Sequence, residues 1–241
     1  MNYPTVKTYI PKVYTEYFMQ YLNEHKQNYD IFGYEYDIEI LQMYGLTDTS
    51  MIWARREAAS TYGGGKSDKD FSNYIEKVLN LLKIDYTDYQ VYIKTCYLPV
   101  DIHVDAEAPN KQAQGQVKTP PQHEQSDGSS IIIPLTFNKN IHTIVFKNTV
   151  LNNDYLREFK NTLTNQPIYK HNLDYSQYNN IWNKDQMMKT GEQLLDHVEL
   201  EEIFVWEENI AFGFDKRRMH SGNDFTKFGI ASKDFVLVHC H

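Results

Sequence analysis

The chain has 241 residues, of which 41% are hydrophobic and 14% aromatic, and its formal net charge at pH 7 is -8. This length suits one domain with a single sizeable core, and the composition is that of a folded protein and not of a disordered one. An acidic chain without blocks of Lys and Arg is a poor candidate for nucleic acid binding, and no stretch approaches the ~20 apolar residues that a membrane-spanning helix needs.

The first 88 residues (1–88) are predicted to brace the rest of the chain with helices and strands. Aromatic and aliphatic residues recur at helical spacing over 11–27, which predicts a helix there. The clearest helix covers 67–83, where the apolar residues form a single stripe. Between these helices, 34–41 and 50–55 alternate like strands.

From residue 89 onward the chain is dominated by apolar stretches of strand length. Strands are predicted at 89–97, 100–105, 130–137, 143–147, 203–215 and 233–239. The loop 138–140 is short, so we expect the strands on either side of it to pair with each other. The predicted fold class is therefore mainly β with flanking α-helices.

Two segments interrupt these strands. Residues 106–128 are rich in Gln and Pro, and Val117 is their one large aliphatic residue, so they cannot bury enough surface to order themselves. This flexible loop leaves directly from Asp105, and it is either a lid over the substrate or a dispensable insertion. Residues about 151–200 are predicted to form a helical insertion between strands.

A histidine and an aspartate stand two residues apart in the stretch Ile102-His103-Val104-Asp105. On an extended strand, side chains two apart point to the same face, so this imidazole and this carboxylate lie side by side. Two His and one carboxylate, with open positions around the metal, are the ligands of non-haem Fe(II) oxygenases. The alternative is an ordinary half-exposed pair on a strand, without a metal.

A metal site of this kind needs one more histidine, and we predict that it is His220. His220 stands in the stretch Met219-His220-Ser221-Gly222, shortly after an apolar strand. The competing candidates are His142, which lies on an apolar strand and suits the core, and His239 and His241 at the end of the chain, where fraying is common.

The order of these motifs resembles the 2-oxoglutarate/Fe(II)-dependent oxygenase superfamily over about residues 89–241. In that family a first strand carries His-x-Asp, and a later strand carries the distal His. The resemblance implies a double-stranded β-helix (jelly-roll) core within one domain over 1–241, with Fe(II) held by His103, Asp105 and His220. It also implies 2-oxoglutarate and O2 as cosubstrates, and hydroxylation of an unactivated C–H bond in a small-molecule or peptide substrate.

In the same family an Arg or Lys after the distal His binds the far carboxylate of 2-oxoglutarate. Two lysines follow His220: Lys227 in a loop and Lys233 at the start of the last predicted strand. We predict Lys233, because a strand can fix an inward-pointing side chain, whereas an exposed Lys at a strand edge is the alternative. Tyr97 resembles the Tyr with which some family members bind the cosubstrate carboxylate, although a core Tyr would look the same.

Two other functions fit the same residues. The chain could be a cupin-like metal-binding jelly roll that does not use 2-oxoglutarate, or a metal-free all-β binding module in which His103 and Asp105 are incidental. Arg217 and Arg218 flank the predicted site, where they either orient an acidic substrate or are simply solvated.

The expected compartment is the cytoplasm. The two cysteines, Cys96 and Cys240, do not suggest a disulfide framework, which favours a reducing environment. The first residues also lack the apolar core of a secretory signal. The oligomeric state and the identity of the substrate do not follow from the sequence.

Overall fold

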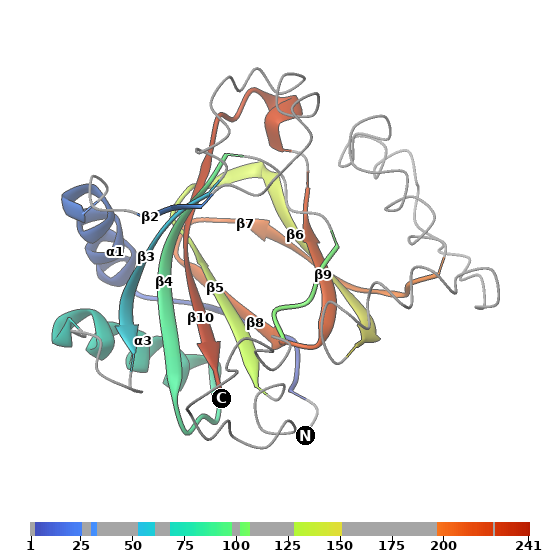
Figure 1. Cartoon of the computed structure of the whole chain (residues 1–241), viewed down its shortest axis with the longest axis horizontal. Coiled ribbons are helices and arrows are strands. Elements are labelled where there is room, and N and C mark those ends of the chain that lie inside the picture. The colour runs from blue at the N-terminus through green and yellow to red at the C-terminus, as the bar shows by residue number, and fades with distance from the viewer. Residues whose placement is uncertain are drawn as a thin grey trace, which may run out of the picture.

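The computed structural model describes residues 3–25, 30–32, 53–60, 68–97, 102–106, 128–150, 197–223 and 225–241. Strands in two antiparallel sheets dominate these residues, so the chain is mainly β as predicted. Helices α1 (Lys12–His25) and α3 (Lys69–Leu82) lie together on one side of the larger sheet (Figure 1).

The larger sheet has seven strands in the order β1-β8-β5-β10-β4-β3-β2, and the smaller sheet has three in the order β7-β6-β9. All neighbouring strands in both sheets pair antiparallel. The strands of the larger sheet are β1 Val6–Tyr9, β8 Ile210–Asp215, β5 Ser129–Pro134, β10 Lys233–Cys240, β4 Tyr89–Cys96, β3 Trp53–Ser60 and β2 Asp30–Phe32. Those of the smaller sheet are β7 Leu200–Trp206, β6 Asn138–Thr149 and β9 Arg218–Gly222.

The helices cover the outer face of the larger sheet, which confirms both helix predictions. Helix α3 begins after Asp68, whose side chain accepts hydrogen bonds from the backbone of Asp70 and Phe71, and it ends at Lys83 in the left-handed conformation. Its apolar stripe, together with Phe18 of α1, is buried against alternate residues of the central strands. This cluster contains Tyr89, Val91 and Ile93 of β4 and Val236 and Val238 of β10.

The other face of the same central strands looks toward the smaller sheet. Cys96 of β4, with Phe235 and Leu237 of β10, belongs to a second buried cluster that includes Phe204 and Trp206 of β7. Because side chains alternate along a strand, every second residue counted from Lys233 points into the space between the sheets. We call this space the interior.

One predicted strand is in fact two strands in different sheets. The apolar stretch 203–215 is divided into β7, which ends at Trp206 in the smaller sheet, and β8, which begins at Ile210 in the larger sheet. Asn209, with a φ of 58°, stands in the turn between them. The prediction was wrong because apolar composition alone does not mark a turn in which Asn takes the place of Gly.

The expected pairing across the loop 138–140 is also wrong. Strand β5 pairs with β8 and β10, whereas β6, which includes 143–147, pairs with β7 and β9. The chain therefore crosses from one sheet to the other between β5 and β6. Periodicity identifies a strand, but it does not identify the neighbours of that strand.

Several predicted segments lie wholly or partly outside the described residues. These are 34–41, the first part of 50–55, residues 107–127 of the 106–128 loop, and 151–196 of the insertion. Within the described ranges, no helix is long and apolar enough to cross a membrane. Cys96 and Cys240 are both buried and free.

Candidate metal centre

The strand predicted at 100–105 is not a regular strand in its described residues, 102–105: His103 alone forms an isolated β-bridge, to His220 of β9. The backbone N–H of His103 donates to the carbonyl of His220, and the N–H of His220 donates to the carbonyl of His103, both at 2.9 Å. Ile102 and Val104 are buried with Met219 on the side of the sheet that faces away from the interior. By alternation, His103, Asp105 and His220 share the opposite side, as the spacing predicted.

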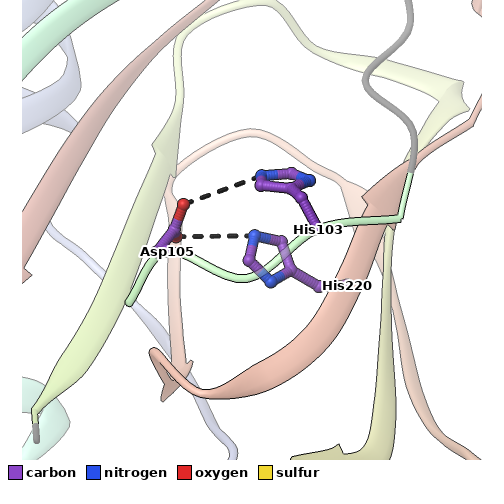
Figure 2. A group of neighbouring side chains, drawn as sticks. All are labelled: His103, Asp105 and His220. Atoms are coloured by element: carbon purple, nitrogen blue, oxygen red, sulfur yellow. Dashed lines mark ion pairs between the residues drawn. The ribbon is translucent and has the colours of Figure 1, made fainter. Parts of the chain in front are cut away.

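The three side chains converge on one point (Figure 2). His103 Nε2 lies 3.6 Å from Asp105 Oδ1, and His220 Nε2 lies 3.4 Å from Asp105 Oδ2. One ligand atom from each residue lies within 4.8 Å of the others, and no other such group of His, Cys, Asp and Glu was found in the described residues. The two imidazoles and the carboxylate could therefore surround a single metal ion.

The hydrogen bonding of His220 leaves its inner nitrogen available. His220 Nδ1 lies 3.0 Å from the backbone carbonyl of Arg218. A carbonyl only accepts hydrogen bonds, so Nδ1 must carry the proton, and in the neutral ring Nε2 then presents a lone pair. This lone pair points at the Asp105 carboxylate, an arrangement that favours a cation or a proton between them. Metal-binding histidines are oriented in this way by their second nitrogen.

Asp105 is held in the ionised form that a metal ligand requires. Burial by itself would raise the pKa of Asp105. In the form of His220 that carries protons on both nitrogens, its charge and its hydrogen bond outweigh burial, with smaller contributions from His239 and His103, and hold that pKa well below its usual range. Metal ligation needs an ionised carboxylate, so this carboxylate does not have to lose a proton before binding.

The competing histidines lie elsewhere. His142 is on β6, where burial lowers its pKa, and its Nδ1 has no hydrogen-bond partner among the described residues. Burial lowers the pKa of His239 to about 3, and its Nδ1 lies 3.3 Å from the Ser130 hydroxyl. His241 Nδ1 accepts from the Lys216 ammonium at 3.1 Å. None of the three belongs to the group of potential ligands.

Lys233 begins β10 and is enclosed by aromatic rings. Its side chain points into the interior, and the residue is only 4% exposed. The Nζ atom lies 4.7 Å from the ring centre of Trp206, 5.5 Å from that of Phe225 and 5.9 Å from that of Phe235. Among the described residues, no carboxylate forms an ion pair with this ammonium. Burial lowers the pKa of Lys233, an effect opposed by Cys96.

The other candidates for cosubstrate binding are less well defined. Tyr97 follows the last residue of β4 and is half-buried. Lys227 lies in the short helix η4 (Phe225–Phe228), but its side chain is not among the described ones.

The sequence analysis did not identify three residues that face the interior: Tyr92 and Lys94 of β4, and His239 of β10. Tyr92 and Lys94 lie on the same face of β4 as Cys96, and the rings of Tyr92 and His239 are 6.0 Å apart. Counting in steps of two from Lys233 would have found His239, and counting back from Cys96 would have found Lys94 and Tyr92.

No protein-family model matches the chain, and a search of curated proteins found no match. Similar solved structures include a prolyl-4-hydroxylase from Pseudomonas putida, with 6% identity, a TM-score of 0.43 and coverage of 98% of this chain and 91% of that chain. Another is HygX from Streptomyces hygroscopicus with nickel and 2-oxoglutarate bound, with 7% identity, a TM-score of 0.43 and coverage of 98% and 83%.

Proposed function

We propose that the chain is an Fe(II)- and 2-oxoglutarate-dependent dioxygenase. In this proposal His103, Asp105 and His220 bind the metal, and Lys233, with Tyr97, binds the cosubstrate. The observation that carries the proposal is the placement of two groups in one interior. Three side chains with metal-ligand atoms converge on one point, and an enclosed ammonium, that of Lys233, contacts aromatic rings and pairs with no carboxylate among the described residues.

The strand order supports a double-stranded β-helix (jelly-roll) core in a single domain over 1–241. In chain order, β4, β5, β8 and β10 lie in the larger sheet and β6, β7 and β9 in the smaller one, to whose edge the segment 102–106 is joined by the bridge between His103 and His220. In the larger sheet the four adjacent strands are β8-β5-β10-β4, and in the smaller sheet they are β7-β6-β9 with 102–106 at the edge. Two packed four-stranded antiparallel sheets are the architecture of an eight-stranded jelly roll.

The three ligands fit Fe(II) by their donor set. Two neutral imidazoles and one carboxylate are the facial ligands of non-haem iron, and they leave positions open for a cosubstrate and O2. The side chain of His103 is 30% exposed, so the site is reached from outside. Iron with 2-oxoglutarate would supply the oxidation of an unactivated C–H bond in a small-molecule or peptide substrate.

Lys233 fits the far carboxylate of the cosubstrate by its position and its charge. The ring of His220 lies 4.6 Å from that of Phe214, and Phe214 belongs to the same buried cluster as Trp206 and Phe235, which enclose Lys233. The metal ligands and the ammonium thus line one interior. A short dicarboxylate held at the metal by one end would bring its other end toward a charge that burial leaves poorly solvated.

An anaerobic titration tests the proposal. Fe(II) and then 2-oxoglutarate are added to the full chain, and the metal-to-ligand absorption band is followed. We expect the band in the wild type and in His142→Ala, and its loss in His220→Ala.

Two other outcomes would support the competing functions. Metal binding without any band would favour a cupin-like metal-binding protein that does not use 2-oxoglutarate. A chain that binds no metal would contradict the metal centre itself and favour a binding module. Succinate release in the presence of O2 gives a second readout that does not depend on the absorption band.

A further inference from the structure

Two of the three potential ligands are held by the backbone of one short turn. The β8–β9 turn, defined here as Asp215–Arg218, carries two carbonyls that meet the ligand residues. The Lys216 carbonyl accepts from the backbone N–H of Asp105 at 3.0 Å and from that of Ala106 at 3.3 Å. The Arg218 carbonyl accepts from His220 Nδ1 at 3.0 Å. The turn thereby sets the place of Asp105 and the ring orientation of His220.

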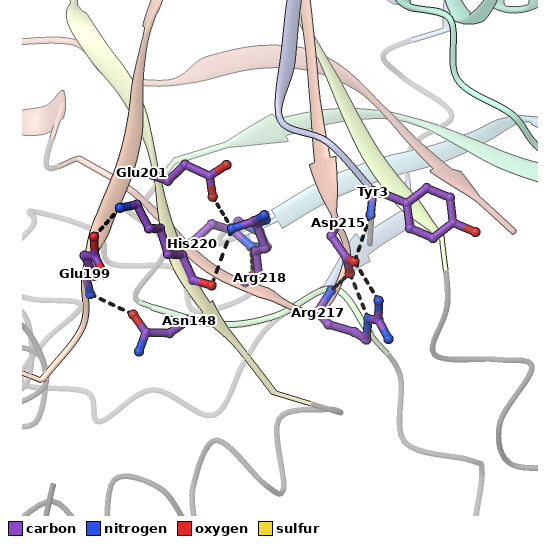
Figure 3. Close-up of polar contacts among 9 residues, drawn as sticks. Tyr3, Asn148, Glu199, Glu201, Asp215, Arg217, Arg218 and His220 are labelled. Atoms are coloured by element: carbon purple, nitrogen blue, oxygen red, sulfur yellow. Dashed lines mark hydrogen bonds and ion pairs between the residues drawn. The ribbon is translucent and has the colours of Figure 1, made fainter. Parts of the chain in front are cut away.

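An ion pair within the turn fixes its shape. The fully buried carboxylate of Asp215 accepts from the Arg217 backbone N–H at 2.9 Å, from Arg217 Nε at 3.0 Å and from Arg217 Nη2 at 2.7 Å (Figure 3). The backbone N–H of Tyr3 also donates to this carboxylate, at 3.4 Å. Burial alone would raise the pKa of Asp215, but the hydrogen bonds and charge of Arg217 lower it, so the carboxylate stays ionised.

A second ion pair ties the start of β9 to the smaller sheet. Arg218 Nη1 pairs with Glu201 Oε2 of β7, and it donates to the Lys147 carbonyl of β6 at 3.4 Å. Arg218 is 8% exposed. Its carbonyl, which holds His220, is therefore fixed by its own side chain.

Both guanidinium groups are thus paired with carboxylates of the protein. These contacts differ from both interpretations that the sequence suggested. Neither Arg is simply solvated, and neither is placed to orient an acidic substrate. A bidentate Arg–carboxylate pair has a defined geometry as well as a favourable energy, which makes it suited to hold a backbone in place.

We propose that Arg217 and Arg218 are positioning residues of the metal centre. The pair of Arg217 with Asp215 fixes the turn whose Lys216 carbonyl holds Asp105. The pair of Arg218 with Glu201 fixes the Arg218 carbonyl, which orients His220. Neither Arg is itself a metal ligand. The inference rests on the proposed metal function of these ligands. Groups that orient metal ligands typically change metal affinity about 10–100-fold when they are removed.

The test is a Co(II) titration of the full chain, followed by the visible absorption of the bound ion. We expect Arg217→Gln to raise the dissociation constant for Co(II) about 10–100-fold and to alter the Co(II) spectrum, which reports ligand geometry. Arg217→Lys, which keeps the charge but loses the two-pronged contact, should lie between Arg217→Gln and the wild type.

The matched control is Lys147→Gln. It breaks the ion pair between Lys147 of β6 and Glu199, the residue before β7, and the Lys147 side chain forms no hydrogen bond with either carbonyl that holds a ligand residue. We expect its Co(II) affinity and spectrum to equal those of the wild type.

A second variant covers the case in which Arg217→Gln fails to fold. Asp215→Asn with Arg217→Gln replaces the buried ion pair by two neutral amides, so no charge is left unpaired. This double variant should melt near the wild-type temperature and still bind Co(II) at least about tenfold more weakly. Wild-type affinity and an unchanged spectrum in a folded Arg217 variant would overturn the inference. A wild-type chain that binds no Co(II) would overturn the inference and the proposed metal centre together.

Discussion

The two charged regions of the interior differ in what surrounds each charge. The Asp105 carboxylate stands between two imidazoles, and one of these, His103, has a side chain that is 30% exposed. The Lys233 ammonium stands among the rings of Trp206, Phe225 and Phe235, and the residue is 4% exposed. One region presents anionic and lone-pair ligands near solvent, and the other presents an enclosed cation.

The cost of a buried charge differs between the two regions. A buried charge is costly unless a partner compensates it, and a protein selected for stability alone would pair these charges with each other or replace them. Among the described residues, Asp105 is paired with the imidazoles of His103 and His220, whereas Lys233 has aromatic contacts and no carboxylate partner. Under the proposed function, the three ligands would hold a metal cation and the Lys233 ammonium would meet a carboxylate of the cosubstrate.

The largest expected effect comes from removing one of the three potential metal ligands. His220→Ala should weaken Fe(II) binding by more than about 100-fold, since even groups that only orient a ligand are worth about 10–100-fold. Isothermal titration under anaerobic conditions measures this, with His142→Ala as the buried-histidine control. Full Fe(II) affinity in His220→Ala would show that the three ligands are wrongly assigned.

The enclosed region should respond to a different ligand. Lys233→Met should weaken 2-oxoglutarate binding at least about 20-fold, because losing one partner of a buried charged pair costs about 2–5 kcal/mol. Fe(II) affinity should stay near that of the wild type. Lys227→Met is the control, and a larger effect from Lys227 than from Lys233 would move the cosubstrate site to η4.

The same substitution should act on stability in the opposite direction. Without ligand, Lys233→Met removes a buried ammonium whose contacts are aromatic, and we expect the free energy of unfolding to rise by about 1 kcal/mol. Urea unfolding of the ligand-free chain measures this. A clear loss of stability would indicate that Lys233 holds the fold together, which would contradict its role as a binding residue.

The sequence predicted those parts of the fold and site that depend on local periodicity. The spacing of His103 and Asp105 placed both side chains on one face, and an apolar stripe predicted helix α3. Lys233 was expected at the start of the last strand, and it is the first residue of β10. These predictions needed only the alternation of a strand or the period of a helix.

The parts that sequence did not predict depend on contacts between distant residues. Nothing local distinguishes Arg217, which binds Asp215, from a solvated Arg, and the carbonyl of Lys216 has no sequence signature at all. The separation of β5 and β6 into different sheets likewise depends on what each strand meets elsewhere in the chain. Such contacts follow from the assembled fold and not from the residues on either side.

The pH dependence of 2-oxoglutarate binding at Lys233 gives a smaller expected effect. Burial lowers the pKa of Lys233 from its ordinary value of 10.5, so its charge is lost at a lower pH than that of an exposed Lys. The affinity for 2-oxoglutarate should be full below this lowered pKa and should fall by up to about tenfold per pH unit above it. A titration series at rising pH measures the fall, and Lys233→Met should not show it.

The contribution of Lys233 to the free energy of unfolding should rise over the range of pH in which the affinity falls. Between the lowered pKa of Lys233 and 10.5, the unfolded chain binds more protons than the folded chain. The contribution of this residue to the free energy of unfolding therefore becomes more favourable as the pH rises through that window. If Lys233→Met and the wild type showed the same pH dependence of both affinity and stability, the cation would have to be placed elsewhere.

The smallest expected effect concerns Tyr97, which follows β4 and is half-buried. If its hydroxyl donates to a carboxylate of 2-oxoglutarate, Tyr97→Phe removes one hydrogen bond worth about 0.5–1.5 kcal/mol and weakens binding by up to about tenfold. Tyr92→Phe is the informative companion, because Tyr92 lies on the interior face of β4, whereas Tyr97 follows the last residue of that strand. Fe(II) affinity should not change in either variant, since the potential metal ligands are the side chains of His103, Asp105 and His220. Unchanged 2-oxoglutarate affinity in Tyr97→Phe, with a loss in Tyr92→Phe, would transfer the role to Tyr92. The cosubstrate would then lie along the β4 face beside Lys94, and two lysines in place of one would face its carboxylates.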